Sequence, residues 1–510
     1  MKRLLQITGL HTEDLAPSLM SFLALFFLLL SYYLVKPLRD SRFFLYFNAD
    51  HLPYFYLVSP VAALIITKIF NFFVDRMQPR KLLIITYSIM MVCKVLFTAL
   101  MQWSNSWSTA VFFIWASVYF SLVLSILWAA INSAFQSQQA ERCFGVIAIG
   151  ATLGSIIGAK VSGLLVESML KDWTLLLSGV SMALALGFTL MIRATPAPEK
   201  SKAATSDSPP QREQPTPQSP GPWDDIKTLL QRPYMRGIAF MVFALALAST
   251  VVNLQVYQQI DESLARTSYQ SLFKDWDPQS QNFERLRDLK GQSKAATKKK
   301  LDALAQTHSE TSPGLPLSPV EMNARYLDYQ THLEGETRKL FANVYFWQGI
   351  LGIVLLGVVA RILFQYAGLS WSTVLLPGFF CLVLILLFFP LEAFMLQGIL
   401  IGAGALNYSL NNATKELLYT PTTPRARYQH KPLIEGPIMR LGDVSASLFK
   451  ITVAGGAAGT LALSQQLQSR ILLGVGLVAS VLWILMIWYT GRQYDKNQNA
   501  EVKSQELDLA

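Results

Sequence analysis

Charged residues are scarce in this chain of 510 residues. Asp, Glu, Lys and Arg together make up 15% of the sequence, whereas soluble domains contain about 25%. Hydrophobic residues make up 52%, the mean hydropathy is +0.34, and the apolar residues come in long runs. This composition excludes a soluble globular enzyme, a disordered chain and an ordinary nucleic-acid-binding domain. It predicts a protein whose main partner is the lipid bilayer, with no nucleic acid bound.

Cysteine and histidine are also rare. The three cysteines, Cys93, Cys143 and Cys381, make no disulfide framework, and the five histidines are scattered without metal-ligand spacing. The chain contains no Gly-Lys dipeptide, so it lacks the phosphate-binding loop of an ATP-driven pump. It also lacks a nucleophile–base constellation. We therefore expect no enzyme activity, no bound metal and no cofactor.

The apolar runs predict an all-α membrane protein, because a membrane-crossing helix needs about 20 apolar residues. Two sets of six spans follow each other, which predicts about 12 transmembrane helices in two six-helix halves of major-facilitator type. The spans are expected at 15–46, 53–74, 82–102, 108–131, 143–167, 173–193, 234–258, 341–366, 371–390, 392–411, 436–462 and 470–490.

The positive charges indicate the orientation. Lys and Arg number 43 against 33 Asp and Glu, which gives a net charge of +10. If the N-terminus is inside, most of these cations fall in cytoplasmic segments, and the short outside loops hold almost only Lys171 and Arg470. The pattern predicts a multi-pass membrane protein with both termini cytoplasmic. The oligomeric state is left open, and a monomer is compatible with the sequence.

Two polar stretches interrupt the spans. Residues 194–233 are rich in proline and are expected to form a cytoplasmic linker. Residues 259–340 are expected outside, either as a small, partly helical domain or as a flexible loop; a loop of this length is exempt from the positive-inside rule. The predicted parts are an N-terminal half (1–193), the linker (194–233), the seventh helix (234–258), the periplasmic insert (259–340), the remaining helices (341–490) and a cytoplasmic tail (491–510).

Glycines recur in the fifth and eleventh spans. Small residues spaced by four let helices approach closely, and their matching places in the two halves support a twofold repeat. The glycines are Gly150, Gly154 and Gly158 in the first half and Gly455, Gly456 and Gly459 in the second.

Charges inside the spans are the main functional signal, because a charge at mid-membrane is costly and usually faces a cavity or a partner. Lys36, Arg39 and Asp40 share one helix face, and the cations Lys68 and Lys94 reach either an interface or an internal path. The excess of cations predicts an anionic substrate. Further cations are Lys160, Arg440 and Lys450, and the acids Asp40, Glu141, Glu435 and Asp443 are expected to balance part of the charge.

The segment Asp75-Arg76-Met77-Gln78-Pro79-Arg80-Lys81 resembles the D-R-x-G-R-[RK] loop of the major facilitator superfamily, with Gln78-Pro79 in place of the glycine. The resemblance implies a cytoplasmic loop in which Asp75 and Arg76 contribute to the gate between the halves.

Three further stretches resemble the nucleotide transporter family, the ATP/ADP translocases of intracellular bacteria and plastids. The first is Tyr32-Tyr33-Leu34-Val35-Lys36-Pro37-Leu38-Arg39-Asp40, and the second contains Glu141-Arg142-Cys143-Phe144-Gly145. The third is Lys415-Glu416-Leu417-Leu418-Tyr419-Thr420-Pro421, followed by Lys431, Glu435 and Arg440-Leu441-Gly442-Asp443. Asp443 stands where the family has a lysine. The Lys-Pro-Leu-Arg-Asp form is that of divergent bacterial relatives, and this resemblance implies a location in a bacterial inner membrane.

The resemblance implies a carrier that exchanges nucleotides or another phosphorylated anion by alternating access. Lys36, Arg39, Asp40 and Arg440 would bind the substrate. Two alternatives remain: a proton-coupled carrier of another anionic solute, and a membrane scaffold acting through 259–340. The residues expected to gate or to form ion pairs are Asp75, Arg76, Glu141, Arg142, Lys415, Glu416, Glu435 and Asp443.

Overall fold

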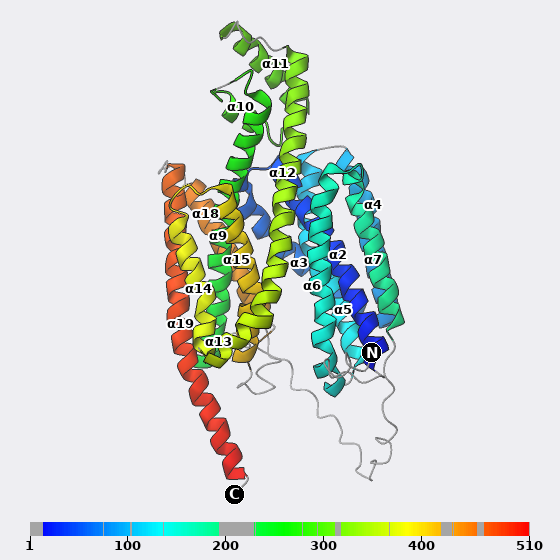
Figure 1. Ribbon diagram of the computed structural model, residues 1–510, viewed down its shortest axis with the longest axis vertical. Helices are drawn as coiled ribbons and strands as arrows, with labels where there is room; N and C mark the ends of the chain where they lie inside the picture. The colour runs from blue at the N-terminus through cyan, green and yellow to red at the C-terminus, as the bar shows by residue number, and fades with distance from the viewer. Residues whose placement is uncertain are drawn as a thin grey trace. The chain divides into compact units, whose positions relative to one another are not determined.

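The protein is described here by a computed structural model, in which the described residues form helices and turns and contain no strand (Figure 1). Almost all of the expected linker, 194–233, lies outside the described residues. The structure describes residues 14–74, 76–102, 105–135, 137–192, 229, 231–277, 279–292, 294–311, 318–366, 368–419, 431, 433–455 and 464–508.

The chain divides into two compact units. The first comprises Met1–Arg193, Asn253–Ile353 and Phe389–Gly402. Helices that lie in it wholly or mostly are α2 (Leu15–Tyr46), η2 (Ala49–His51), α3 (Leu52–Val74), α4 (Pro79–Gln102), α5 (Ser106–Ala134), α6 (Ser137–Leu164), η3 (Leu165–Glu167), η4 (Lys171–Trp173), α7 (Thr174–Met191), α10 (Phe283–Arg287), α11 (Lys294–Thr311), α12 (Pro319–Val354) and α15 (Ala393–Leu406).

The second unit comprises Ala194–Val252, Val354–Phe388 and Ala403–Ala510. The helix α9 (Pro233–Phe273) begins in this unit and ends in the first. This unit also contains three π-helical turns: η6 (Leu355–Val359), η7 (Asn407–Asn411) and η8 (Ile434–Ile438). Its other α-helices are α13 (Ala360–Tyr366), α14 (Gly368–Leu386), α16 (Asn412–Leu418), α18 (Met439–Gly455) and α19 (Gln465–Asp508).

Within the described residues, ten helices are long and apolar enough to cross a membrane, and the shorter apolar helix Trp371–Leu386 is an eleventh candidate. The predicted span 436–462 covers part of η8, then α18, and runs into residues outside the described part. On α3, large apolar side chains such as Leu64 and Ile69 are more than half exposed, as a lipid-facing surface requires. The expected all-helical membrane fold is confirmed.

The packing of α2 against α6 is the most extensive between any two helices. It follows from the predicted glycines, because at each of them a Cβ atom would collide with the α2 backbone. The three close approaches join Gly150 to Phe22, Gly154 to Phe26 and Gly158 to Leu30. The contacts of the predicted second-half glycines lie outside the described part of the chain; these are Gly455, Gly456 and Gly459.

The described residues of 259–340 form helices that share a core. The helix α9 continues beyond the expected end of the seventh span, and α12 begins before the expected eighth span, so both pass into the insert (Figure 1). Arg325 forms a bidentate ion pair with Asp275 at 2.7 and 2.9 Å and lowers the pKa of that carboxyl through this hydrogen bonding. The shared core contains Tyr269, Phe273, Trp276, Phe283, Leu286, Met322 and Tyr329.

Candidate functional site

The helix α2 holds the first predicted charge cluster. It runs without interruption from Leu15 to Tyr46, with Pro37 inside it, so its 3.6-residue period places Lys36, Arg39 and Asp40 near one another. Asp40 is 6% exposed. A buried carboxylate next to an arginine needs that arginine as its partner.

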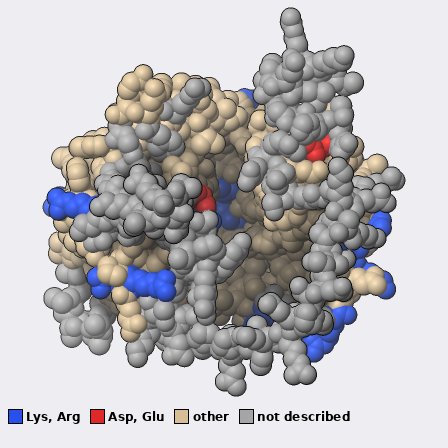
Figure 2. Space-filling model, turned by 90° about the horizontal axis from the view of Figure 1, so that it is seen from below, with Lys and Arg blue, Asp and Glu red and all other residues tan. Residues whose placement is uncertain are grey.

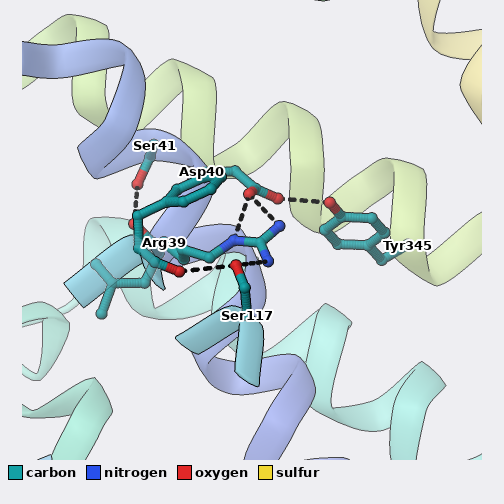
Figure 3. Close-up of polar contacts among 7 residues, drawn as sticks. Arg39, Asp40, Ser41, Ser117 and Tyr345 are labelled. Atoms are coloured by element: carbon teal, nitrogen blue, oxygen red, sulfur yellow. Dashed lines mark hydrogen bonds and ion pairs between the residues drawn. The ribbon is translucent and has the colours of Figure 1, made fainter. Parts of the chain in front are cut away.

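Arg39 and Asp40 form an ion pair, with the arginine Nε 2.8 Å from the carboxylate Oδ1 (Figure 3). The other carboxylate oxygen accepts a hydrogen bond from the hydroxyl of Tyr345 on α12. The guanidinium also lies 4.8 Å from the centroid of the Phe113 ring and contacts the hydroxyl of Ser117, both on α5. Asp40 is therefore fully partnered, and the charge of Arg39 is neutralised.

Lys36 has different surroundings. Its ammonium nitrogen is 3.9 Å from the ring centroid of Tyr345, 5.3 Å from that of Tyr33 and 6.0 Å from that of Tyr32. These distances allow cation–π attraction. Among the described residues, Lys36 forms no ion pair. The cluster of Lys36, Arg39 and Asp40 therefore carries one uncompensated positive charge, which is located on Lys36.

Lys94 on α4 is completely buried, at 0% exposure, so it does not extend to an interface. Its ammonium nitrogen donates to the hydroxyls of Ser31 on α2 and Ser178 on α7, both at 2.6 Å. The same nitrogen lies 5.2 Å from the Tyr119 ring centroid. Lys94 thus links three helices through neutral groups, a second internal cation in this unit.

Arg440, the predicted substrate residue of the second half, lies on α18 in the second unit and is 54% exposed. It contacts the Asp443 carboxylate at 3.3 Å. Asp443 also accepts a hydrogen bond from Thr250 at 2.8 Å. The acid that replaces the lysine of the resembling family is therefore bound to its own helix neighbour.

The other predicted ion-pair residues of the second unit form two pairs. Lys415 on α16 lies 3.2 Å from Glu435 in the π-helical turn η8. Lys431 lies 2.6 Å from Glu416. Each acid predicted to balance a cation in this unit thus has a basic partner close by.

The predicted gating residues of the first half are less fully described. Asp75 lies outside the described residues. Arg76 is exposed, donates to the carbonyl of Phe72 at 2.8 Å and stacks over that ring. Glu141 and Arg142 belong to α6, but their side chains lie outside the described part.

Sequence reasoning missed the groups that complete the first cluster. Tyr345, Ser117 and Phe113 carry no charge and belong to no motif, so nothing in the sequence marks them as partners of α2. The tyrosines at positions 32 and 33 adjoin Lys36 in the quoted motif, and they offered the one available signal of an aromatic site.

Comparison with known proteins agrees with this architecture. The sequence profile of the Major Facilitator Superfamily matches residues 21–273. No curated protein matches the chain in sequence. A mutant of the nucleoside transporter NupG has a crystal structure that is similar, with a TM-score of 0.52 and 13% identity over 94% of this chain and 100% of that one.

The chain has the major facilitator fold. A second structure, of a bacterial homologue of the human lysosomal transporter Spinster in an inward-facing, unoccupied conformation, is 12% identical over 96% of this chain and 97% of that one, with a TM-score of 0.41. The profile match and the fold support a membrane transporter of the major facilitator type. The resemblance to the ATP/ADP translocases stays a prediction.

Proposed function

We propose that this protein carries nucleotides, or another phosphorylated anion, across a membrane by alternating access of its two halves. The observation that supports this proposal best is Lys36, a cation ringed by tyrosines and without an ion-pair partner among the described residues. A phosphate group would supply the missing negative charge, and the tyrosine rings offer faces on which a base could stack.

The neighbouring Arg39 already has a partner, because Asp40 neutralises its charge. A phosphate beside Lys36 would compete with Asp40 for the guanidinium, which can bind phosphate through two parallel hydrogen bonds. In the second unit, Arg440 is paired with Asp443, and a phosphate group would compete for that guanidinium in the same way.

The fold comparison favours a nucleotide-like solute without deciding its charge. NupG is a nucleoside transporter, and nucleosides are neutral. The cation at Lys36 is the feature that we take to select a phosphorylated relative of such a solute.

A proton-coupled carrier is a second candidate function, and Asp40 favours it. Its carboxylate is buried and bound by both Arg39 and Tyr345, and a transported proton on it would remove the charge that holds Arg39. Transport by this mechanism would depend on the proton gradient and would not require a counter-transported nucleotide.

The decisive experiment is an uptake assay in bacteria that express the full chain. Labelled ATP, ADP, adenosine and inorganic phosphate are compared in wild type, Lys36→Met, Lys36→Arg and Lys68→Met. Lys68 is exposed on α3, so its variant removes an equal charge away from the cluster. We expect Lys36→Met to lower ATP uptake about ten- to a hundredfold, the range that loss of one charged hydrogen bond implies.

Lys36→Arg should retain part of the activity, and Lys68→Met should resemble wild type. Preference for adenosine over ATP, or equal activity of both methionine variants, would refute the anion proposal. Faster uptake after preloading with unlabelled nucleotide would support exchange. Uptake that stops when the proton gradient is removed, and that does not change with preloading, would favour the proton-coupled carrier.

A further inference from the structure

A cavity of about 880 Å³ lies within the first unit, where the insert meets the helices of the N-terminal half. Its volume is within the range of small-molecule sites, about 300–1,000 Å³. The insert contributes residues of α11 and α12, while α2, α4 and η4 provide the opposite walls. Each of these helices contributes at least one lining residue: Lys298 from α11, Arg338 from α12, Arg42 from α2, Gln102 from α4 and Asp172 from η4.

The charge of the lining is predominantly positive. Its acidic members are Asp172 and Glu334, and Glu334 is already paired with Arg42 at 2.7 Å. Five cations against two acids leave a formal charge of +3. The five cations are Arg42, Lys171, Lys294, Lys298 and Arg338.

Arg338 is the buried member of this set, at 4% exposure. One of its terminal nitrogens donates to the Thr174 hydroxyl at 2.6 Å, and the other is 3.5 Å from the Lys171 carbonyl. Its Nε has no hydrogen-bond partner among the described residues and is covered by protein atoms. A guanidinium has five N–H donors, so the two terminal nitrogens of Arg338 keep N–H groups beyond these contacts that can donate to an acceptor in the cavity.

At the rim, Lys294 and Lys298 of α11 are exposed, and neither forms an ion pair with a described residue. They lie one helical turn apart, so both can approach the same ligand. The lining also includes Tyr326, which is 4% exposed. The cavity thus combines an inner arginine, an aromatic wall and two rim lysines.

We propose that this cavity binds a phosphate-bearing anion, separately from the cluster at Lys36. Neither Lys36 nor Arg39 lines it, although Leu38 and Arg42 of the same helix do. Phosphate oxygens would accept from the remaining terminal N–H groups of Arg338 and from the two rim lysines. The phosphate belongs either to a soluble solute or to the head group of an anionic lipid. The site does not depend on transport of such an anion by the protein.

The test measures binding of inorganic pyrophosphate to the full chain in nanodiscs of phosphatidylcholine by titration calorimetry. The variant Lys294→Gln/Lys298→Gln removes the rim charges without disturbing the buried arginine. The control Lys299→Gln/Lys300→Gln removes equal charge from exposed positions of the same helix that do not line the cavity. A lipid arm compares thermal unfolding of the same proteins with and without phosphatidylglycerol.

We expect the rim variant to weaken pyrophosphate binding about tenfold, while the control binds as wild type. A second supporting outcome is that pyrophosphate fails to bind while phosphatidylglycerol raises the unfolding temperature of the wild type and the control. If the rim variant alone loses this stabilisation, the site is supported and its ligand is a lipid head group. Equal weakening in the two lysine variants, or no response to either probe, would overturn the proposal.

Discussion

Adjacent residues on α2 hold opposite charges in a largely buried setting. The Arg39 side chain is 15% exposed and that of Asp40 is 7%. Two such charges are tolerated because they neutralise each other and because Tyr345 supplies a further hydrogen bond. The pair therefore has a structural role in addition to the proposed role in binding, and the two roles can be separated.

If the two roles are separate, removing the Arg39 charge and removing the Lys36 charge should change the stability of the protein unequally. Arg39→Met leaves the Asp40 carboxylate buried without its cation and should cost about 3–5 kcal/mol of stability, the usual penalty for breaking a buried pair. Lys36→Met breaks no ion pair among the described residues and should leave stability nearly unchanged. Thermal unfolding of the purified proteins in detergent measures both.

The double variant Arg39→Met/Asp40→Asn is the matched control, because it removes both charges together. It should recover most of the stability lost in Arg39→Met while remaining inactive in uptake. If Arg39→Met and Lys36→Met shift the unfolding temperature equally, the ion pair is not the dominant interaction of this cluster.

At this scale the sequence predicts charges well and their partners poorly. Lys36, Arg39 and Asp40 could be placed together because helix geometry fixes residues three and four apart. Tyr345 contacts Asp40 across 305 positions of the chain, and no local rule connects residues so distant. For Lys94, charge alone did not distinguish a cation extending to an interface from one buried against Ser31 and Ser178.

At the scale of elements, glycines decide how closely α6 approaches α2. A Cβ at Gly154 would collide with the carbonyl oxygen of Phe26, and backbone atoms cannot move aside as a flexible side chain can. On the same helix, Gly145 has nothing within 4 Å of the position where its Cβ would be. One helix therefore offers both a constrained glycine and a free one.

We expect Gly154→Ala to lower stability by about 1–3 kcal/mol, the cost of overpacking a close contact. Gly145→Ala should be neutral or stabilising by about 0.5–1 kcal/mol, because alanine favours the helix. Chemical denaturation in detergent, followed by tryptophan fluorescence, compares the two. Equal losses in both variants would mean that α6 does not depend on the close approach at Gly154.

The ends of helices were harder to predict than their existence. Hydropathy marks only the apolar part of a helix, so α9 and α12 extend beyond the spans expected at 234–258 and 341–366. Their polar ends continue as helices because they pack on the insert core around Tyr269 and Tyr329. The π-helical turns at η6, η7 and η8 leave no hydropathy signal at all.

At the scale of the whole molecule, the distribution of Lys and Arg indicates how the protein is oriented in the membrane. Lys and Arg side chains are more frequent than Asp and Glu among the coloured residues on the face shown in Figure 2. An excess of cations is what the positive-inside rule expects of a cytoplasmic face.

The proposed topology therefore places both termini and the linker 194–233 in the cytoplasm and residues 259–340 in the periplasm of a bacterial cell. Alkaline phosphatase inserted at residue 300 should be active, because it folds only in an oxidising compartment. The same reporter at residue 210 should be inactive, whereas a fluorescent protein there should be bright. The opposite pattern at both positions would invert the protein in the membrane, and equal signals would mean an even number of membrane crossings between them.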